Sequence, residues 1–306
     1  MTRIACVGAG LVGSAWAFVF ARGGCDVAIY DARGEAARDQ TQALLERTTR
    51  MTGADPALID RVRFVDTLAE ALDGAVHVQE SIKEDVAVKR GVFREMDALA
   101  GPETVLASST SAIMGSSFLD IPGAARALVA HPVNPPSLIP LVELCPTPST
   151  APETVARTRG LMEGLGMKPV ELTREIDGFL LNRLQYTLVA EAMHLVGEGY
   201  CSAADIDRVL TDGLALRWST LGPFAVAHLN AAGGFADFVA HLGGMMRQMG
   251  QSARTDYDWT QEMVDRIHDD ISAGIPVEKL SAWQAWRDEN ILETRRVQAM
   301  ADDRRP

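Results

Sequence analysis

A glycine-rich stretch near the N-terminus constrains the fold of this 306-residue chain more than any other feature of its sequence. Gly8, Gly10 and Gly13 form a G-x-G-x-x-G pattern directly after a short apolar run at 3–7. Residues 11–22 contain no proline and are rich in alanine, which is typical of a helix. Strand, tight turn and helix in this order are the setting in which such glycines bind a dinucleotide.

Each residue of this turn has a physical role in the predicted cofactor site. Gly8 permits the tight turn, Gly10 lets the backbone approach a pyrophosphate, and Gly13 lets the helix pack closely on the strand. The helix begins at Leu11 and Val12, where free N–H groups and the positive end of the helix dipole face the phosphates. A glycine turn without any ligand is the alternative interpretation.

The residue after the second predicted strand, at 26–30, indicates which dinucleotide binds. This residue is Asp31, whose carboxylate would accept hydrogen bonds from the adenosine ribose hydroxyls and would repel a 2′-phosphate. The sequence therefore predicts NAD rather than NADP. Arg33 weakens this prediction, because a cation two residues further on partly offsets the repulsion.

Strand and helix patterns alternate over the first half of the chain. This alternation predicts an α/β fold of the Rossmann type, with a doubly wound, mainly parallel sheet covered by helices on both faces. From about residue 176 onward only helical patterns and loops remain. We therefore expect an NAD-binding domain at 1–175 and an all-α domain at 176–306.

The helical half carries more apolar surface than a single domain needs. Its first helical run repeats large apolar residues at helical spacing, namely Leu180, Leu184, Leu188, Ala192 and Leu195. We predict that this domain binds substrate and forms a homodimer that buries part of this surface. An ordinary intramolecular core is the alternative.

Charge and cysteine content exclude several other classes of protein. The net charge of −12 argues against binding to nucleic acid or to an anionic membrane, because such contacts need clustered Lys and Arg. The four cysteines are scattered without metal-ligand spacing, so no metal site is expected and a reducing compartment fits best. We see no cleavable signal and no apolar segment of spanning length, and we expect a cytoplasmic protein.

Polar residues that follow predicted strands are the candidates for the reacting end of the cofactor. Glu80 and Ser109 follow strands expected at 75–79 and 105–108, where they would approach the nicotinamide or its ribose. Solvated turn residues are the alternative for both. His131 ends another predicted strand and suits a general base, because the pKa of histidine lies near working pH. Glu143, beyond a proline-rich loop, would orient its ring.

Four motifs together resemble the signature of the L-3-hydroxyacyl-CoA dehydrogenase superfamily over nearly the whole chain. They are Ser-Ser-Thr-Ser at 108–111, His-Pro-Val-Asn-Pro at 131–135, Leu-Val-Glu at 141–143 and Gly-Phe-Leu-Leu-Asn-Arg at 178–183. Three later segments, at 213–218, 222–223 and 286–289, look most like the lambda-crystallin branch, the L-gulonate 3-dehydrogenases.

This resemblance implies a set of site residues. Ser111 would hydrogen-bond the reacting oxygen, His131 would act as general acid and base, Glu143 would orient the histidine, and Asn182 would position substrate and histidine. Asn134 is expected to line the same pocket. The implied reaction is the NAD-dependent oxidation of the 3-hydroxyl of a small hydroxy carboxylate, similar to L-gulonate, to the 3-keto acid.

Arg217 is the residue that indicates whether the substrate is a free carboxylate or a thioester. A guanidinium binds a free carboxylate in bidentate fashion, whereas a thioester has no charge beside its reacting carbon. A surface arginine stacked on Trp218 is the alternative. L-3-hydroxyacyl-CoA and carnitine stay open as rival substrates, and Trp218 or Trp16 would serve the cationic head of carnitine. A crystallin-like structural or NAD-sensing protein is the non-enzymatic alternative.

Overall fold

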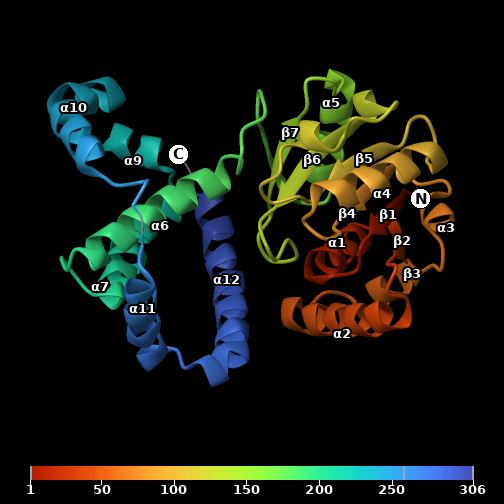
Figure 1. Cartoon of the computed structure of the whole chain (residues 1–306), viewed down its shortest axis with the longest axis horizontal. Coiled ribbons are helices and arrows are strands. Elements are labelled where there is room, and N and C mark those ends of the chain that lie inside the picture. The colour runs from red at the N-terminus through yellow and green to blue at the C-terminus, as the bar shows by residue number, and fades with distance from the viewer. Residues whose placement is uncertain (1, 258, 305–306) are drawn as a thin grey trace. The chain divides into compact units, whose positions relative to one another are not determined.

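The computed structural model describes residues 2–257 and 259–304 and divides into two compact units, Met1–Arg183 and Leu184–Pro306 (Figure 1). The division falls in the first turn of helix α6, Leu181–Gly197. The sequence placed the domain boundary between 175 and 176, whereas residues 176–183 belong to the first compact unit. They do so because their backbone hydrogen-bonds to side chains and loops of that unit, as described below.

The first unit is built on one eight-stranded sheet, with the strand order β3-β2-β1-β4-β5-β6-β7-β8. All neighbouring strands are parallel except β6 and β7, which are antiparallel. The strands are β1 Arg3–Val7, β2 Asp26–Tyr30, β3 Val62–Phe64, β4 His77–Glu80, β5 Val105–Ser108, β6 Ala127–Pro132, β7 Leu141–Pro146 and β8 Lys168–Glu171. The predicted doubly wound, mainly parallel sheet is thus confirmed.

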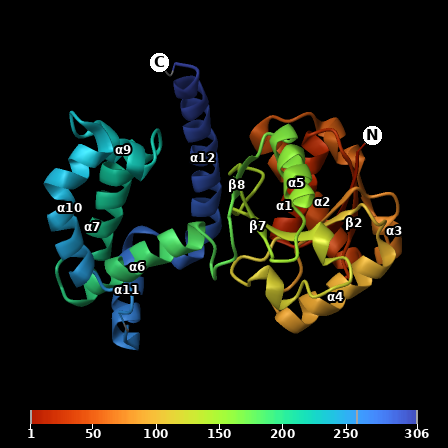
Figure 2. The same cartoon turned by 90° about the horizontal axis from the view of Figure 1, so that it is seen from above.

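Helices cover both faces of this sheet because the side chains of its strands alternate between two apolar cores. Ile4 and Cys6 of β1 face the core formed with α1, α2 and α5, whereas Ala5 and Val7 face the core formed with α3 and α4. Figure 2 shows these helices around the sheet. The helices are α1 Leu11–Arg22, α2 Glu35–Thr52, α3 Leu68–Leu72, α4 Val86–Leu99 and α5 Pro152–Gly164, with short 3-10 turns η1 Pro56–Arg61, η2 Gly115–Ser117 and η3 Ala124–Arg126.

The strand order reverses direction between β1 and β4, which lie side by side in the sheet. In an open α/β sheet, ligands bind outside the carboxyl ends of the strands at such a reversal. The turn that carries the three glycines follows β1 at this point. The topology therefore places the predicted cofactor turn where a cofactor site is expected.

The described residues of the second unit form helices and no strand, as predicted for this half. The helices after α6 are α7 Ala203–Arg208, the π-helical turn η4 Val209–Leu214, α8 Ala215–Trp218, α9 Pro223–Leu229, α10 Gly234–Ser252, α11 Gln261–Gly274, the 3-10 turn η5 Val277–Lys279 and α12 Leu280–Asp302. Among the described helices, none combines the length and the apolar character needed to cross a membrane.

Candidate active site

The glycine turn after β1 has the close packing that its sequence pattern predicts. Gly8 has a φ of +98°, and a Cβ there would lie 2.6 Å from the carbonyl oxygen of Ser81. A Cβ on Gly13 would lie 1.9 Å from the carbonyl oxygen of Gly8, so only glycine lets α1 approach the strand this closely. A Cβ on Gly10 would point into open space, and no side chain caps the helix that Gly10 begins.

This open space belongs to a cavity of about 630 Å³ that Gly8, Gly10, Asp31 and Ser81 help to line. Its walls offer backbone at a helix N-terminus, apolar surface and two carboxylates, one of which is Asp31. Helix N-termini, apolar walls and a carboxylate bind pyrophosphate, adenine and ribose, respectively. Leu11 is exposed and Val12 half-buried in the first turn of α1. The residues present therefore fit a dinucleotide.

Asp31 lies directly after β2 and is held on both carboxylate oxygens. Its Oδ2 accepts a hydrogen bond of 2.7 Å from the backbone N–H of Ala9, and Arg33 contacts both oxygens. Partial burial opposes ionisation, but the hydrogen bonds from Arg33 and Ala9 outweigh it and hold the pKa of Asp31 below its ordinary value. The carboxylate is thus charged at neutral pH.

Glu80 does not fill the role that the sequence predicted for it. Its side chain is fully buried at the end of β4. One oxygen accepts from the ammonium of Lys89 at 2.8 Å and from the N–H of Ile82, and the other accepts from the hydroxyl of Ser108 at 2.6 Å. The prediction that Glu80 contacts the cofactor is wrong, because this carboxylate has no exposed surface and stabilises a buried lysine.

The accessible carboxylate in this region is Glu84, which sequence reasoning missed. Its Oε1 accepts hydrogen bonds from the hydroxyl of Thr110 at 2.6 Å and from the N–H of Ser111 at 2.8 Å, and its other oxygen lies 3.3 Å from Lys89. Burial opposes ionisation of Glu84, but these donors and Lys89 keep its pKa below the ordinary value. In the sequence, the only indication was Lys89, five residues after Glu84. Sequence alone does not show which of the two carboxylates, Glu80 or Glu84, this lysine contacts.

Ser109 lies half-buried directly after β5, in a chain of polar side chains. Its hydroxyl accepts from the amide of Gln79 at 2.7 Å and lies 2.9 Å from the hydroxyl of Ser81, which lines the cofactor cavity. The same amide of Gln79 donates to the carbonyl of Ala130, the residue before His131. Ser109 therefore connects the cavity to the strand that carries the histidine.

His131 and Glu143 form a buried pair whose geometry follows from strand register. They are directly opposed residues of the antiparallel strands β6 and β7, and Nδ1 of the histidine lies 2.9 Å from Oε2 of the glutamate. Burial opposes ionisation of Glu143, but hydrogen bonds from His131 and from two backbone N–H groups keep its pKa below the ordinary value. An ionised Glu143 makes Nδ1 the protonated nitrogen and leaves Nε2 with a free lone pair.

The segment 178–182 connects this pair to the other candidate residues. Oε1 of Glu143 accepts hydrogen bonds from the N–H groups of Leu180, at 2.8 Å, and Leu181, at 3.0 Å. One residue later, the amide of Asn182 donates to the carbonyl of Ser111 at 2.6 Å. The structure thus links Ser111, His131, Glu143 and Asn182 through one short stretch of backbone.

Phe179 gives this segment its sharp turn, and sequence reasoning did not single it out. Among the described residues it is the only one besides glycine with a positive φ, at 51°. Its ring is fully buried, with its centroid 5.3 Å from that of the His131 ring. The strained backbone presents the next two N–H groups to Glu143, while the ring packs against the histidine that Glu143 orients.

Three further predicted residues lie apart from this network. Asn134 is exposed in the loop between β6 and β7, two residues beyond the end of β6. Arg217 is exposed on α8 in the second unit, so its role toward the substrate stays a prediction. Trp16 is fully buried in the core against Phe20, which rules it out as a subsite for the cationic head of carnitine.

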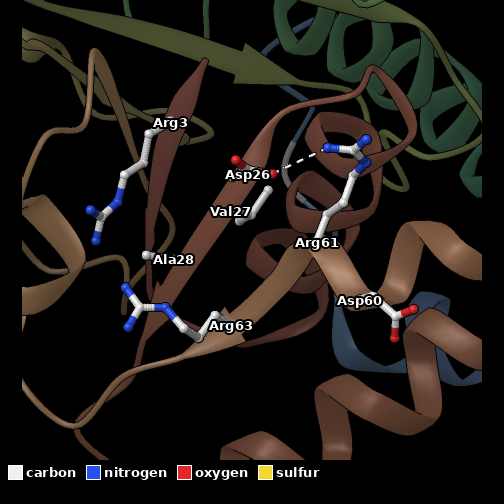
Figure 3. A pocket seen from close by; sticks show the side chains of 7 residues that line it. All are labelled: Arg3, Asp26, Val27, Ala28, Asp60, Arg61 and Arg63. Carbon is white, nitrogen blue, oxygen red and sulfur yellow. Dashed lines mark hydrogen bonds and ion pairs between the residues drawn. The ribbon is translucent and has the colours of Figure 1, made fainter. Parts of the chain in front are cut away.

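A separate hollow of about 330 Å³ is lined by residues that include Arg3, Asp26, Arg61 and Arg63 (Figure 3). Arg61 is paired with Asp26 at 3.2 Å, and Arg3 lies 3.4 Å from Asp73. Arg3 and Asp26 begin β1 and β2, so this hollow adjoins the amino ends of these strands, whereas the glycine turn follows their carboxyl ends. It is therefore distinct from the candidate active site.

Family models match both halves of the chain. The model for the NAD binding domain of 3-hydroxyacyl-CoA dehydrogenase matches residues 3–176, and the model for the C-terminal domain of the same enzymes matches residues 178–274. The chain belongs to the 3-hydroxyacyl-CoA dehydrogenase family. It is an oxidoreductase that acts on CH–OH groups with NAD as its cofactor.

Comparison with individual relatives indicates which branch of the family the chain resembles. The chain is 38% identical over 297 residues to the lambda-crystallin homolog of Bos taurus, covering 93% of this chain and 92% of the relative. It is 36% identical over 286 residues to the L-carnitine dehydrogenase of Streptomyces coelicolor, covering 89% and 86%. A solved structure of an NAD+-dependent dismutase, 5-formyl-3-hydroxy-2-methylpyridine 4-carboxylic acid 5-dehydrogenase, matches with a TM-score of 0.84 at 27% identity over 98% of this chain and 99% of that one. The match to the lambda-crystallin homolog supports the lambda-crystallin branch of the family.

Proposed function

We propose that this dehydrogenase oxidises the 3-hydroxyl of a small hydroxy carboxylate, similar to L-gulonate, to the 3-keto acid. The observation that carries the proposal is the buried pair of His131 and Glu143, with the glutamate bound to two backbone N–H groups. Bound NAD supplies the hydride acceptor at C4 of its nicotinamide. The residues of the chain supply the proton acceptor and the groups that hold the reacting oxygen.

His131 acts as the general base through Nε2. Glu143 is ionised and accepts from Nδ1, so the neutral imidazole keeps its lone pair on the other nitrogen. As the substrate hydroxyl loses its proton to Nε2, the imidazolium that forms is stabilised by the adjacent carboxylate. In the reverse direction the same nitrogen returns the proton to the carbonyl oxygen.

Ser111 and Asn182 hold the oxygen from which the proton leaves. Asn182 fixes the loop of Ser111 through its carbonyl, and Glu84 binds the N–H of Ser111 from the other side. The hydroxyl of Ser111 lies 3.3 Å from Glu84 and turns toward the substrate oxygen as it binds. Because the backbone of Ser111 is fixed, only its hydroxyl has to turn, and it then stabilises the alkoxide character that develops on this oxygen. Asn134 completes the pocket in this proposal.

Arg217 binds the carboxylate of the substrate, from the same subunit or from a dimer partner. The relatives support a substrate with a free carboxylate, since one is named for carnitine, itself a carboxylate, and another for a pyridine carboxylic acid. A guanidinium binds such a group with two parallel hydrogen bonds. L-carnitine is therefore the second candidate substrate, and L-3-hydroxyacyl-CoA is the third.

A parallel assay with NAD tests the substrate class. Free L-gulonate, L-3-hydroxybutyrate, L-carnitine and L-3-hydroxybutyryl-CoA are compared by kcat/KM, and L-gulonate is expected to be preferred. Arg217→Ala is expected to raise KM for the preferred carboxylate about tenfold or more, because a charge-assisted pair is lost. Arg208→Ala, a surface arginine in the same unit paired with Asp205, is the control. Preference for the thioester, or an unchanged KM in Arg217→Ala, would contradict the proposal.

A homodimer through the helical domain belongs to the same proposal. On α10, five large apolar residues are spaced alternately four and three apart and are each between 38% and 54% exposed, namely Phe235, Val239, Leu242, Met246 and Met249. Such a stripe packs against a partner helix, and a second copy supplies one by symmetry. Light scattering should give twice the monomer mass for the wild type, and Leu242→Glu should lower it.

A cytoplasmic location is the remaining part of the proposal. Cys6, Cys25, Cys145 and Cys201 are all free thiols, and the first three are buried. Free buried thiols persist in a reducing compartment. Fractionation of cells that express the tagged chain tests this location.

A further inference from the structure

The adenosine end of the cofactor site contains a contact that its sequence pattern does not predict. Arg33 folds back onto Asp31, so that its Nε lies 3.0 Å from Oδ1 and its Nη2 lies 3.0 Å from Oδ2. This is the bidentate geometry in which a guanidinium binds a carboxylate most strongly. The carboxylate expected to hold the ribose of NAD is therefore already engaged.

Counting hydrogen-bond positions shows what this engagement means for NAD. A carboxylate has about four lone-pair positions. On Asp31, backbone N–H groups of Ala9 and Arg33 fill two of them, at 2.7 and 2.8 Å, and the guanidinium of Arg33 fills the other two. The backbone donors are fixed by the fold. Two ribose hydroxyls can bind Asp31 only after the guanidinium has left it.

The released guanidinium stays beside the ribose. Arg33 is two residues from Asp31, and both residues line the cavity of about 630 Å³ that also contains Gly8 and Gly10. The side chain of Arg33 is 53% exposed and that of Asp31 only 12%, so the arginine moves at little cost while the aspartate does not. A cation is thus available beside Asp31, the carboxylate that is expected to hold the adenosine ribose.

Arg38 is the other arginine near this position. It lines a neighbouring hollow of about 310 Å³ together with Asp31 and Gly34. Its guanidinium lies over the ring of Phe64, 5.5 Å from the centroid, and 3.8 Å from Asp66. These contacts hold Arg38 close to β3, the edge strand of the sheet. Arg33, by contrast, contacts the carboxylate of Asp31 directly.

We propose that Arg33 selects the cofactor in two opposite ways. It competes with the ribose of NAD for Asp31, and it is the residue that binds the 2′-phosphate of NADP, so the enzyme accepts NADP as a second cofactor. When NADP binds, the guanidinium turns toward the phosphate, which offers oxygens of the same geometry and more charge, and the positive charge of Arg33 offsets the repulsion between Asp31 and the phosphate. The proposal concerns the adenosine end only and does not depend on which hydroxy acid is oxidised.

Direct binding of NADH and NADPH, followed by fluorescence of the reduced nicotinamide, tests the proposal without turnover. The wild type should bind both. Arg33→Ala should increase the affinity for NADH about two- to fivefold, because the variant removes one exposed ion pair that competes with the ribose. The same variant should weaken NADPH about tenfold or more, because a charge-assisted contact to phosphate is lost. The reciprocal change, Asp31→Asn, should weaken NADH and tighten NADPH.

Two matched arginine variants make the outcome decisive. Arg61→Ala removes an arginine that is paired with an aspartate of the same sheet, at the opposite ends of the strands, and should leave both affinities unchanged. Arg38→Ala should affect NADPH less than Arg33→Ala does. Failure of the wild type to bind NADPH would overturn the proposal. So would a shift of both affinities in the same direction in Arg33→Ala, or a larger loss of NADPH binding in Arg38→Ala.

Discussion

Each end of the proposed cofactor site contains a carboxylate that is paired with a nitrogen-containing side chain. The two pairs differ in burial. Glu143 and His131 are 2% and 6% exposed, whereas Asp31 and Arg33 are 12% and 53% exposed. Both carboxylates also accept two backbone N–H groups, and both have a pKa below the ordinary value. The backbone thus fixes the carboxylate in both places, while burial decides whether its partner is fixed as well.

This difference matches the two tasks. Proton transfer needs a base that stays in one orientation, and a buried ring between Glu143 and Phe179 has little freedom to turn. Cofactor binding needs a carboxylate that can exchange its partner, and an exposed guanidinium can leave at small cost. Removing a partner from the buried pair should therefore change activity strongly, and doing so at the exposed pair should change it weakly.

His131→Asn should have the largest effect. Asparagine retains a polar group of smaller size but cannot accept and return the proton, so kcat should fall about 100-fold or more. NADH affinity should stay close to the wild type, and the midpoint of thermal unfolding should fall by no more than the few degrees expected from loss of the contact with Glu143, which shows that the fold and the cofactor site survive. Retained turnover would mean that another group removes the proton.

Glu143→Gln should have the next largest effect. The amide occupies the same space and can still accept from Leu180 and Leu181, but it carries no charge to stabilise the imidazolium. We expect kcat to fall about 10- to 100-fold. Glu103→Gln is the control, because Glu103 is 89% exposed and lies before β5, away from the carboxyl ends of the strands. Equal kinetics for the two variants would show that the charge of Glu143 has no part in catalysis.

Much of this architecture was predictable, because it follows from local patterns. The glycine turn is specified by residues a few positions apart, and Gly8 and Gly13 lie where a Cβ would collide with backbone. The contact between His131 and Glu143 follows from strand pairing across one loop, which places the two residues opposite each other. Both features depend on backbone geometry that the sequence pattern encodes directly.

What could not be predicted depends on side-chain packing across the fold. Glu80 and Glu84 flank the same turn and both contact Lys89 of α4, yet the first side chain is fully buried and the second is 38% exposed. The contact of Arg33 with Asp31 depends on a rotamer, which spacing does not specify. Phe179 lies inside a motif that was recognised, yet its strained φ is visible only in the structure.

Phe179→Leu tests the buried pair without changing its charge, and it should lower kcat less than Glu143→Gln does. Leucine keeps apolar volume but removes the ring that packs on His131, so the imidazole should sample more orientations. We expect kcat to fall about three- to tenfold, with NADH affinity unchanged. Phe93→Leu removes a ring from the same core without contact to the histidine and is the matched control. A similar loss of kcat in both variants would indicate a general packing defect.

The pH dependence of stability should show the smallest difference between the two pairs. Because both carboxylates have a lowered pKa in the folded state, each stabilises the protein above its ordinary pKa of about 4, and this contribution is lost as pH falls through the folded value. Glu143→Gln should therefore lower the thermal midpoint by a few degrees at pH 7, and the gap to the wild type should narrow toward pH 3. Asp31→Asn should show the same trend with a smaller gap, since an exposed pair contributes less. A larger gap for Asp31→Asn would mean that burial does not separate the two pairs, and the assignment of a fixed pair for catalysis and an exchangeable pair for cofactor selection would have to be abandoned.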